Sequence, residues 1–472
     1  MRPRGACTAT TIVIVGVLML AFAASAFAKC TTLIVGNDAT ADGSVLIAHT
    51  EDLGDNSAQV YKVLSPVKYA GGSVYELFSG GSVPQPAVSQ GYFASSVFSK
   101  DWVPGDITSS LNEHQVAIYN NRTYSRAYPK DPWQIQPGGV IWTEFNQLAA
   151  QQAESAREAV AIMGALSEAH WLSADPGTSF AVADAHEGWW IEIARGGQWV
   201  AQRVPDDGAV MRVNAFAIGE IEFDDPENFM WSSDVIGYAQ ERGWYDPATG
   251  GAFSWKDAYS QPGSADWAWN AMRVERIQGW LDSLVPNVTK DDVMTMLRDH
   301  YEGTPYDYSR GYAVSPHRTK ARTVCVKDTE VAYVTQLRSW MPAEIGGLAW
   351  ISMKTPCSGA FVPWYMGTTR VPKVYTVGTN KVTAGSAWWA FQQLMLKVDR
   401  HCGATIGTVR ERWGAFEARQ FARQAEVEAK ALAVYQTDPD AARAYLTRCS
   451  NRRAVKAYET ALELFDEVKD AS

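Results

Sequence analysis

The sequence of 472 residues has few cysteines and histidines, and it contains no internal repeat and no low-complexity tract. Its six cysteines are widely and irregularly spaced, and its seven histidines are scattered, so no pair has the spacing of metal ligands. We therefore expect no structural or catalytic metal and no cofactor. A net charge of -10 and a pI near 5.3 argue against binding to nucleic acid or to anionic membrane surfaces.

The one long apolar run lies at the N-terminus. Arg2 and Arg4 precede an apolar stretch at residues 11–28 that ends in Ala-Phe-Ala, which is typical of a secretory signal peptide. An uncleaved membrane anchor is an alternative, whereas a lipid-modified Cys30 is disfavoured because Lys29 precedes it. We expect an exported protein, periplasmic or extracellular, with no stable membrane insertion after processing.

A β-hairpin is predicted directly after the leader. Residues 31–35 and 44–48 are apolar and flank a run that is dense in turn-forming residues. With the turn centred near residues 40 and 41, antiparallel pairing places Cys30 opposite Glu51. The hairpin then brings a thiol and a carboxylate to one end.

Cys30 is the candidate nucleophile, and Asp52 and His49 lie next to it in this register. If processing leaves Cys30 as the first residue, its own α-amine, which titrates at about 7.7–8.0, can accept the thiol proton. The alternatives are a buried apolar cysteine or half of a disulfide.

Four later cysteines (Cys325, Cys357, Cys402 and Cys449) permit two disulfides, and their pairing is left open.

Several segments resemble the cysteine dipeptidases among the N-terminal nucleophile hydrolases, relatives of penicillin V acylase and bile salt hydrolase. They extend over most of the chain from Cys30 to about Gly367. The segments are CTTLIVGNDATADGSVLIAHTED, LNEHQVAI, WWIEIARGGQWVAQRVPDD, VNAFAIGEIEFDDPENFMWSSD, AMRVERIQGW and QLRSWMPAEIGGLAW.

The resemblance implies roles for particular residues. Asn214 matches the asparagine that stabilises the oxyanion, and Arg273 matches an arginine near the nucleophile, with Arg276 the weaker candidate. Asp52 is implied to orient the terminal amine. His49 stands where relatives carry arginine, so it acts either as a protonated substitute for that cation or as a general base.

The fold class expected from the pattern is α+β. A helix is predicted over residues 145–166, and four short apolar runs between residues 179 and 216 predict an antiparallel meander. The resemblance sharpens this expectation to the four-layer αββα sandwich of N-terminal nucleophile hydrolases.

Three divisions of the chain are predicted. The last is helical in composition, with breaks near residues 437–440 and 449–451, and it either packs on the body or contributes to a homo-oligomer. The divisions are residues 1–29 (signal peptide and one pro-residue), 30–370 (hydrolase domain) and 371–472 (C-terminal helical region).

The function expected from these features is an exported cysteine-type dipeptidase that hydrolyses small peptides through a thioester on Cys30. An N-acyl amide hydrolase of the penicillin V acylase type is the alternative within the same superfamily. A non-enzymatic exported binding protein, with Cys30 as an anchor or structural residue, is the alternative outside it.

Overall fold

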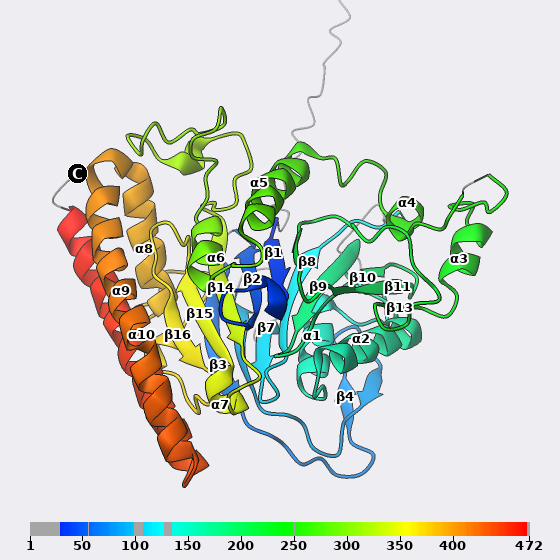
Figure 1. Cartoon of the computed structure of the whole chain (residues 1–472), viewed down its shortest axis with the longest axis horizontal. Helices are drawn as coiled ribbons and strands as arrows, with labels where there is room; N and C mark the ends of the chain where they lie inside the picture. Colours follow the sequence, from blue (N-terminus) through cyan, green and yellow to red (C-terminus); the bar gives the residue numbers. More distant parts are fainter. Residues whose placement is uncertain (1–28, 55, 99–106, 127–134, 250, 470–472) are drawn as a thin grey trace, which may run out of the picture.

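The computed structural model shows two stacked β-sheets with helices on both outer faces (Figure 1). This is the predicted αββα arrangement with additional C-terminal helices, so the predicted fold class is confirmed. The described residues are 29–54, 56–98, 107–126, 135–249 and 251–469. The predicted signal peptide lies outside them.

The first sheet has six strands and contains the N-terminal hairpin at its centre. In spatial order its strands are β12 (Ala209–Arg212), β1 (Thr31–Val35), β2 (Val45–Asp52), β14 (Thr329–Leu337), β15 (Leu348–Met353) and β16 (Val362–Tyr365). The fourth run of the predicted meander is β12, which leaves the other three runs and pairs with β1. The single meander predicted there is therefore wrong.

The second sheet has eight antiparallel strands and includes the other three runs of that meander. In spatial order they are β13 (Phe229–Trp231), β11 (Trp199–Val204), β10 (Gly188–Ala194), β9 (Gly177–Ala183), β8 (Ala117–Arg122), β7 (Ile107–Asn112), β6 (Tyr92–Phe98) and β3 (Ala58–Leu64). A separate small hairpin consists of β4 (Val74–Glu76) and β5 (Ser82–Pro84).

Alternating side chains along the strands build three apolar layers. In β1, Ile34 points between the sheets, whereas Leu33 and Val35 pack toward the helices on the outer face. In β9, Ala181 lies between the sheets and Phe180 faces the outer layer. Both sheets are thus buried on two faces, which explains why their strands are buried at nearly every position.

Helices cover the outer face of each sheet. The eight-stranded sheet is covered by α1 (Trp142–Ala150) and α2 (Ala156–His170), and the six-stranded sheet by α5 (Ala268–Leu284) and α6 (Lys290–Met296). The single helix predicted over residues 145–166 is wrong, because Ser155 begins a second helix by accepting a hydrogen bond from the Glu158 N–H. Shorter helices are α3 (Val235–Glu241), α4 (Trp255–Tyr259) and α7 (Ala343–Gly346).

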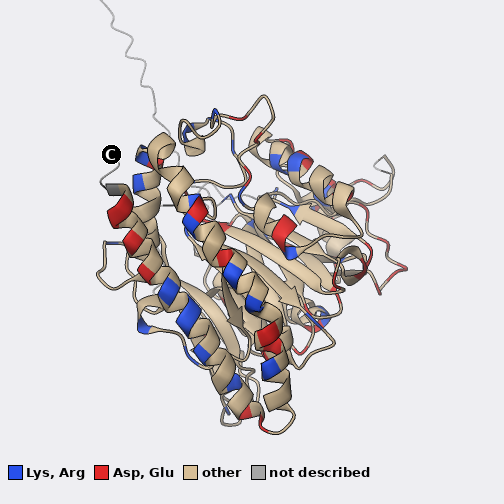
Figure 2. Cartoon of the chain, turned by 60° about the vertical axis from the view of Figure 1, so that its left-hand side comes forward, with Lys and Arg blue, Asp and Glu red and all other residues tan. Residues whose placement is uncertain are grey.

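The C-terminal region forms three helices, α8 (Ala387–Arg400), α9 (Cys402–Tyr435) and α10 (Pro439–Lys469). These helices pack beside the edge strand β16, and their cover protects β16 from pairing with another chain (Figure 1). The predicted break near residue 437 is confirmed, but that near residue 449 is wrong because α10 continues through it. Acidic and basic residues are interspersed along α9, whereas on α10 the basic residues precede a group of acidic residues near the C-terminal end (Figure 2).

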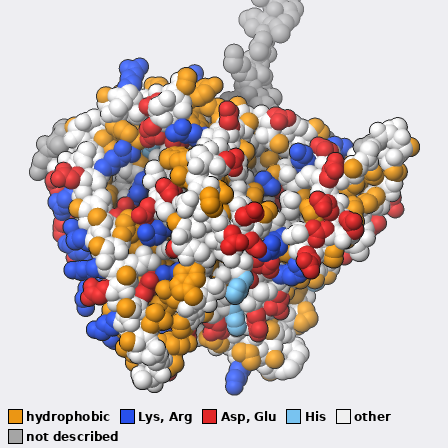
Figure 3. All heavy atoms as spheres, in the orientation of Figure 1, with side chains coloured by type: hydrophobic (Ala, Val, Ile, Leu, Met, Phe, Trp, Pro, Cys, Tyr) orange, Lys and Arg blue, Asp and Glu red, His pale blue; other side chains and the backbone are white. Residues whose placement is uncertain are grey.

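On the face shown in Figure 3, acidic and basic side chains are interspersed with hydrophobic and uncharged ones. No helix among the described residues is both long and apolar enough to span a membrane.

Candidate active site

The hairpin of β1 and β2 places Cys30 at its open end. Thr31 pairs with Thr50 and Val35 with Leu46, so the turn is centred between residues 40 and 41, as predicted. Cys30 therefore lies opposite Glu51, and its Sγ donates to Glu51 Oε1 at 3.6 Å. The thiol is 1% exposed.

An imidazole completes this cluster. His49 Nε2 lies 3.4 Å from Glu51 Oε2, and its Nδ1 lies 2.7 Å from Thr32 Oγ1. The ligand atoms of Cys30, His49 and Glu51 all lie within 4.8 Å of one another. The predicted gathering of a thiol, a carboxylate and an imidazole is confirmed.

Burial raises the pKa of the Cys30 thiol well above its ordinary value, and the nearby negative charges of Glu51 and Asp52 raise it further. The thiol is therefore protonated at neutral pH. Since the thiolate is the nucleophilic form, the site needs a base or compensating positive charge to activate it.

Asp52 ends β2 and is held by three donors. Its carboxylate accepts hydrogen bonds from Thr50 Oγ1 at 3.1 Å and Thr329 Oγ1 at 2.7 Å, and it forms a buried ion pair with Arg322. Arg322 was not predicted from the sequence. This residue lies in a loop with no recognisable motif, and only the fold brings it to the hairpin.

Arg273 lies on α5 and is fully buried at the same end of the hairpin. Its Nη1 donates to Cys30 O at 2.7 Å and to Thr31 Oγ1 at 2.9 Å, and its Nη2 donates to Asn214 Oδ1 at 3.2 Å. Arg276, one turn further along, instead pairs with Asp299 near the surface. The structure thus places Arg273, and not Arg276, beside the candidate nucleophile.

Asn214 lies two residues beyond β12 and is buried. Its Nδ2 donates to the Arg122 carbonyl at 3.0 Å, while its Oδ1 accepts from Arg273. The same guanidinium therefore links Asn214 to Cys30. The Asn214 Nδ2 carries two N–H groups, so it can keep its bond to the Arg122 carbonyl and use the other N–H as a donor.

Lys29 precedes the nucleophile in this structure, and two guanidinium groups hold its carbonyl oxygen. Arg273 Nη1 donates to it at 2.7 Å, and Arg322 Nη2 donates to it as well. The Lys29 ammonium lies 5.4 Å from the centre of the Trp269 ring. The carbonyl of the bond between Lys29 and Cys30 is therefore polarised next to the thiol.

A narrow cavity with room for about one water molecule lies beside this cluster. Within it the Arg122 Nε donates to Asp175 Oδ1 at 2.8 Å in a buried ion pair. The lining residues are Glu51, Leu53, Asn120, Arg122, Trp142, Asp175 and Thr178. It is far smaller than the pockets of about 300–1,000 Å³ that usually hold drug-sized ligands.

Comparison with known proteins gives consistent matches. The model of Peptidase family C69 matches residues 29–414. The probable dipeptidase of Salmonella dublin is 30% identical over 383 residues, covering 76% of this chain and 84% of that protein. The probable dipeptidase of Latilactobacillus sakei is 26% identical, covering 79% and 82%.

Among solved structures, a mutant of the conjugated bile acid hydrolase from Clostridium perfringens aligns with a TM-score of 0.38 and 10% identity. The alignment covers 71% of this chain and 92% of that one.

Proposed function

Because this chain belongs to Peptidase family C69 and is a cysteine-type peptidase, we propose that it hydrolyses dipeptides through a thioester on Cys30. The observation that carries the proposal is the buried Cys30 thiol beside a small cavity lined by charges of both signs. The names of the relatives, probable dipeptidases, support the same substrate class.

Before any substrate reacts, removal of Lys29 leaves Cys30 as the first residue, with a free α-amine. This amine takes the thiol proton, and the sulfur attacks the carbonyl carbon of the substrate. Asn214 and a backbone N–H stabilise the negative oxygen of the tetrahedral intermediate. The first amino acid stays on sulfur as a thioester while the second departs as an amine, and water then releases the first.

Asp52 and Arg273 support these steps from opposite sides of Cys30. Asp52 is positioned to orient the new α-amine because it lies next to the nucleophile at the end of β2 and is fixed by Thr50, Thr329 and Arg322. Arg273 supplies fixed positive charge, which favours the thiolate over the thiol.

The charges of the cavity favour dipeptides over neutral N-acyl amides. A dipeptide brings one ammonium and one carboxylate, and each needs an opposite charge when it is buried. Arg122 supplies positive charge, and Asp175 and Glu51 supply negative charge. An N-acyl amide has no ammonium to offer these two carboxylates, which then keep only their partners within the protein, Arg122 and His49.

We further propose that the protein acts outside the cytoplasm, in the periplasm or the extracellular medium. The support is the leader-like sequence of residues 1–28, which lie outside the described residues. After processing, the enzyme needs no stable membrane insertion. A homo-oligomer through the C-terminal helices is compatible with the charged residues that these helices carry (Figure 2).

The test uses purified protein whose N-terminus has been shown by intact mass to be Cys30. Hydrolysis of a free dipeptide is compared with that of its N-acetyl form and of an N-acyl amide. We expect kcat/KM for the N-acetyl form to be about 10²–10⁴ lower, since an unpaired buried charge costs about 3–5 kcal/mol.

Two cysteine variants act as controls. Cys30→Ala removes the nucleophile and should abolish turnover, whereas Cys449→Ser, on α10, should retain it. Faster turnover of the N-acyl amide than of the dipeptide would move the assignment to the acylase alternative. Dipeptide hydrolysis by folded Cys30→Ala would overturn the mechanism altogether.

A further inference from the structure

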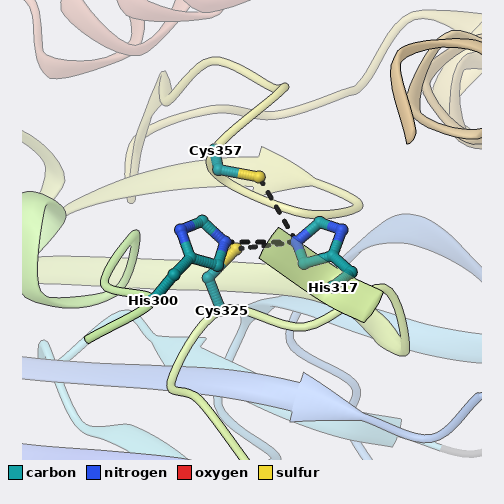
Figure 4. Close-up of side chains that lie close together, drawn as sticks. All are labelled: His300, His317, Cys325 and Cys357. Carbon is teal, nitrogen blue, oxygen red and sulfur yellow. Dashed lines mark hydrogen bonds between the residues drawn. The ribbon is translucent and has the colours of Figure 1, made fainter. Parts of the chain in front are cut away.

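A second cluster of metal-binding side chains lies outside the active site. It comes from four separate places: the turn after α6, the short helix at Pro316–Arg318, the segment before β14 and the turn between β15 and β16. We call it the His2Cys2 cluster, and its members are His300, His317, Cys325 and Cys357 (Figure 4).

The four side chains converge on one point. His317 Nε2 lies 3.2 Å from His300 Nε2, 3.8 Å from Cys325 Sγ and 3.6 Å from Cys357 Sγ. All four ligand atoms lie within 4.8 Å of one another, and three of the residues are buried, with His317 partly so. The two imidazoles and two thiols turn toward a shared centre (Figure 4).

These separations are those of a tetrahedral zinc site. With Zn–N of about 2.0–2.1 Å and Zn–S of about 2.3 Å, a tetrahedron has N···N edges of about 3.3–3.4 Å and N···S edges of about 3.5–3.6 Å. The measured N···N separation is 3.2 Å, and the two N···S separations are 3.6 and 3.8 Å. We propose that the His2Cys2 cluster binds one structural Zn²⁺.

Carboxylates behind both imidazoles are a second, independent indication. His317 Nδ1 lies 2.7 Å from Asp399 Oδ1, and His300 Nδ1 lies 3.2 Å from Glu302 Oε1. Each carboxylate accepts the Nδ1 proton and leaves the Nε2 lone pair directed at the centre. Histidines that bind zinc are oriented in this way by carboxylates.

The donor set distinguishes zinc from an iron–sulfur cluster. In a two-iron cluster with two histidines and two cysteines, both histidines bind one iron and both cysteines bind the other. Here both thiols approach the same His317 nitrogen, which requires a single ion. Two thiolates and two neutral imidazoles around Zn²⁺ give an electrically neutral centre, which suits a buried position.

The site has four protein ligands, so it has no open position for water or substrate, and its role is structural. It joins the loop between α6 and β14 to the turn between β15 and β16, and Asp399 adds a connection to α8. The segment between His317 and Cys325 contains Arg322, which contacts Asp52 and the Lys29 carbonyl. The zinc site therefore holds the loop that brings Arg322 to the active site.

The sequence-based expectation of no metal depended on spacing along the chain. Neighbouring members of the cluster are 17, 8 and 32 residues apart (317 − 300, 325 − 317 and 357 − 325), which differs from the short ligand spacings of zinc-binding motifs. Our proposal replaces that expectation, because the fold and not a local motif assembles the donors.

The first experiment measures the metal content of the full chain purified without chelators, by inductively coupled plasma mass spectrometry. We expect about one zinc per chain in the wild-type protein. Cys357→Ser and His317→Gln should lose most of it. Cys449→Ser should retain it. Cys30→Ser should retain it as well, which tests the second candidate group among the described residues, Cys30 with His49 and Glu51.

The second experiment needs only the wild-type protein and so remains decisive if the variants fail to fold. Zinc is removed with a chelator and replaced by Co²⁺, whose tetrahedral thiolate complexes absorb strongly in the visible and near-ultraviolet. In parallel, alkylation mapped by peptide mass spectrometry should label Cys325 and Cys357 only after chelation. Neither readout depends on peptidase activity, so failure of the proposed function leaves this test intact.

Three results would overturn the proposal. One is metal-free protein with Cys325 and Cys357 joined in a disulfide. Another is zinc retained by folded Cys357→Ser and His317→Gln. The third is zinc lost from Cys30→Ser, which would place the ion in the active site.

Discussion

Replacing Arg273 tests how the active site is held together, and Arg276 on the same helix provides a matched control. The Arg273 guanidinium makes six hydrogen bonds, to Lys29 O, Cys30 O, Thr31 Oγ1, Asn214 Oδ1, Asn270 Oδ1 and Trp269 O. Arg276 pairs with Asp299, and its side chain is 30% exposed. Arg273→Met and Arg276→Met therefore remove the same charge from a buried and from a partly exposed position.

The expected magnitudes differ clearly. Removing one partner from a buried charged network costs about 3–5 kcal/mol, because the remaining polar groups lose their partner without regaining water. The Arg276–Asp299 pair lies between an exposed pair, which contributes about 0–1 kcal/mol, and a buried one, because Arg276 reaches solvent while the Asp299 side chain is 3% exposed. Without Arg276, Asp299 keeps a hydrogen bond from the Tyr301 N–H. We expect Arg273→Met to lower the free energy of unfolding by about 3–5 kcal/mol and Arg276→Met by about 1–2 kcal/mol.

Urea unfolding monitored by tryptophan fluorescence measures both values, with the N-terminus of each protein defined by intact mass. Arg273→Lys adds a second comparison, because lysine keeps the charge but cannot reach all six acceptors from one ammonium, so its loss should be intermediate. Equal destabilisation by Arg273→Met and Arg276→Met would refute the view that Arg273 organises the site.

Three further predictions concern the chemistry. Asn214→Ala should lower kcat for dipeptides by about 10²–10³ in a folded protein, and a change in KM alone would contradict an oxyanion role. Glu51→Gln should lower the pKa of the Cys30 thiol, because it removes the nearest negative charge. Alkylation of Cys30 at neutral pH should then become faster, and a slower reaction would show that the Glu51 charge does not raise this pKa. Arg322→Gln should slow removal of Lys29 from purified precursor by about 10²–10³, followed by intact mass, if the polarised Lys29 carbonyl is the target of Cys30.

Local sequence patterns were sufficient for the hairpin, and the family resemblance was sufficient for the choice between two arginines. Two apolar runs and the dense turn between them define the register of β1 and β2, so Cys30 opposite Glu51 follows from counting. The capping box of α6 is also a local feature, since Thr289 and Asp292 lie three residues apart and bond to each other's backbone N–H groups. On α5, the resemblance selected Arg273, which the structure places at the nucleophile.

Interactions between distant segments were not accessible in this way. Arg322 contacts Asp52 across 270 residues, and the His2Cys2 cluster combines four segments. β12 follows β11 in the chain but pairs with β1 in the six-stranded sheet, because pairing with β1 competes with pairing to β11. The position of β12 therefore depends on a strand that is distant in the sequence. No single-segment pattern contains such information.

His49 differs from the arginine of its relatives, and its hydrogen bonds favour the cation role over the base role. Thr32 Oγ1 donates to Asn121 Oδ1, so it can only accept from His49 Nδ1, which therefore carries a proton. His49 Nε2 faces the Glu51 carboxylate at 3.4 Å. In the cation role, both His49 nitrogens carry protons and donate to Thr32 and Glu51, so no nitrogen is left to take a proton from Cys30.

The decisive comparison is between His49→Arg and His49→Phe. The imidazole stacks with the Tyr119 ring at a centroid distance of 5.4 Å and with Tyr333 at 6.1 Å, a setting that also suits a planar guanidinium. We expect His49→Arg, which donates to both Thr32 and Glu51, to retain activity and to extend it toward alkaline pH. His49→Phe keeps the stacking but leaves Glu51 unpaired, and should lose at least about 10² in kcat/KM. Dipeptide hydrolysis across pH, measured on proteins that begin at Cys30, separates the roles: if His49 is a general base, both variants lose turnover together, because neither arginine nor phenylalanine accepts a proton.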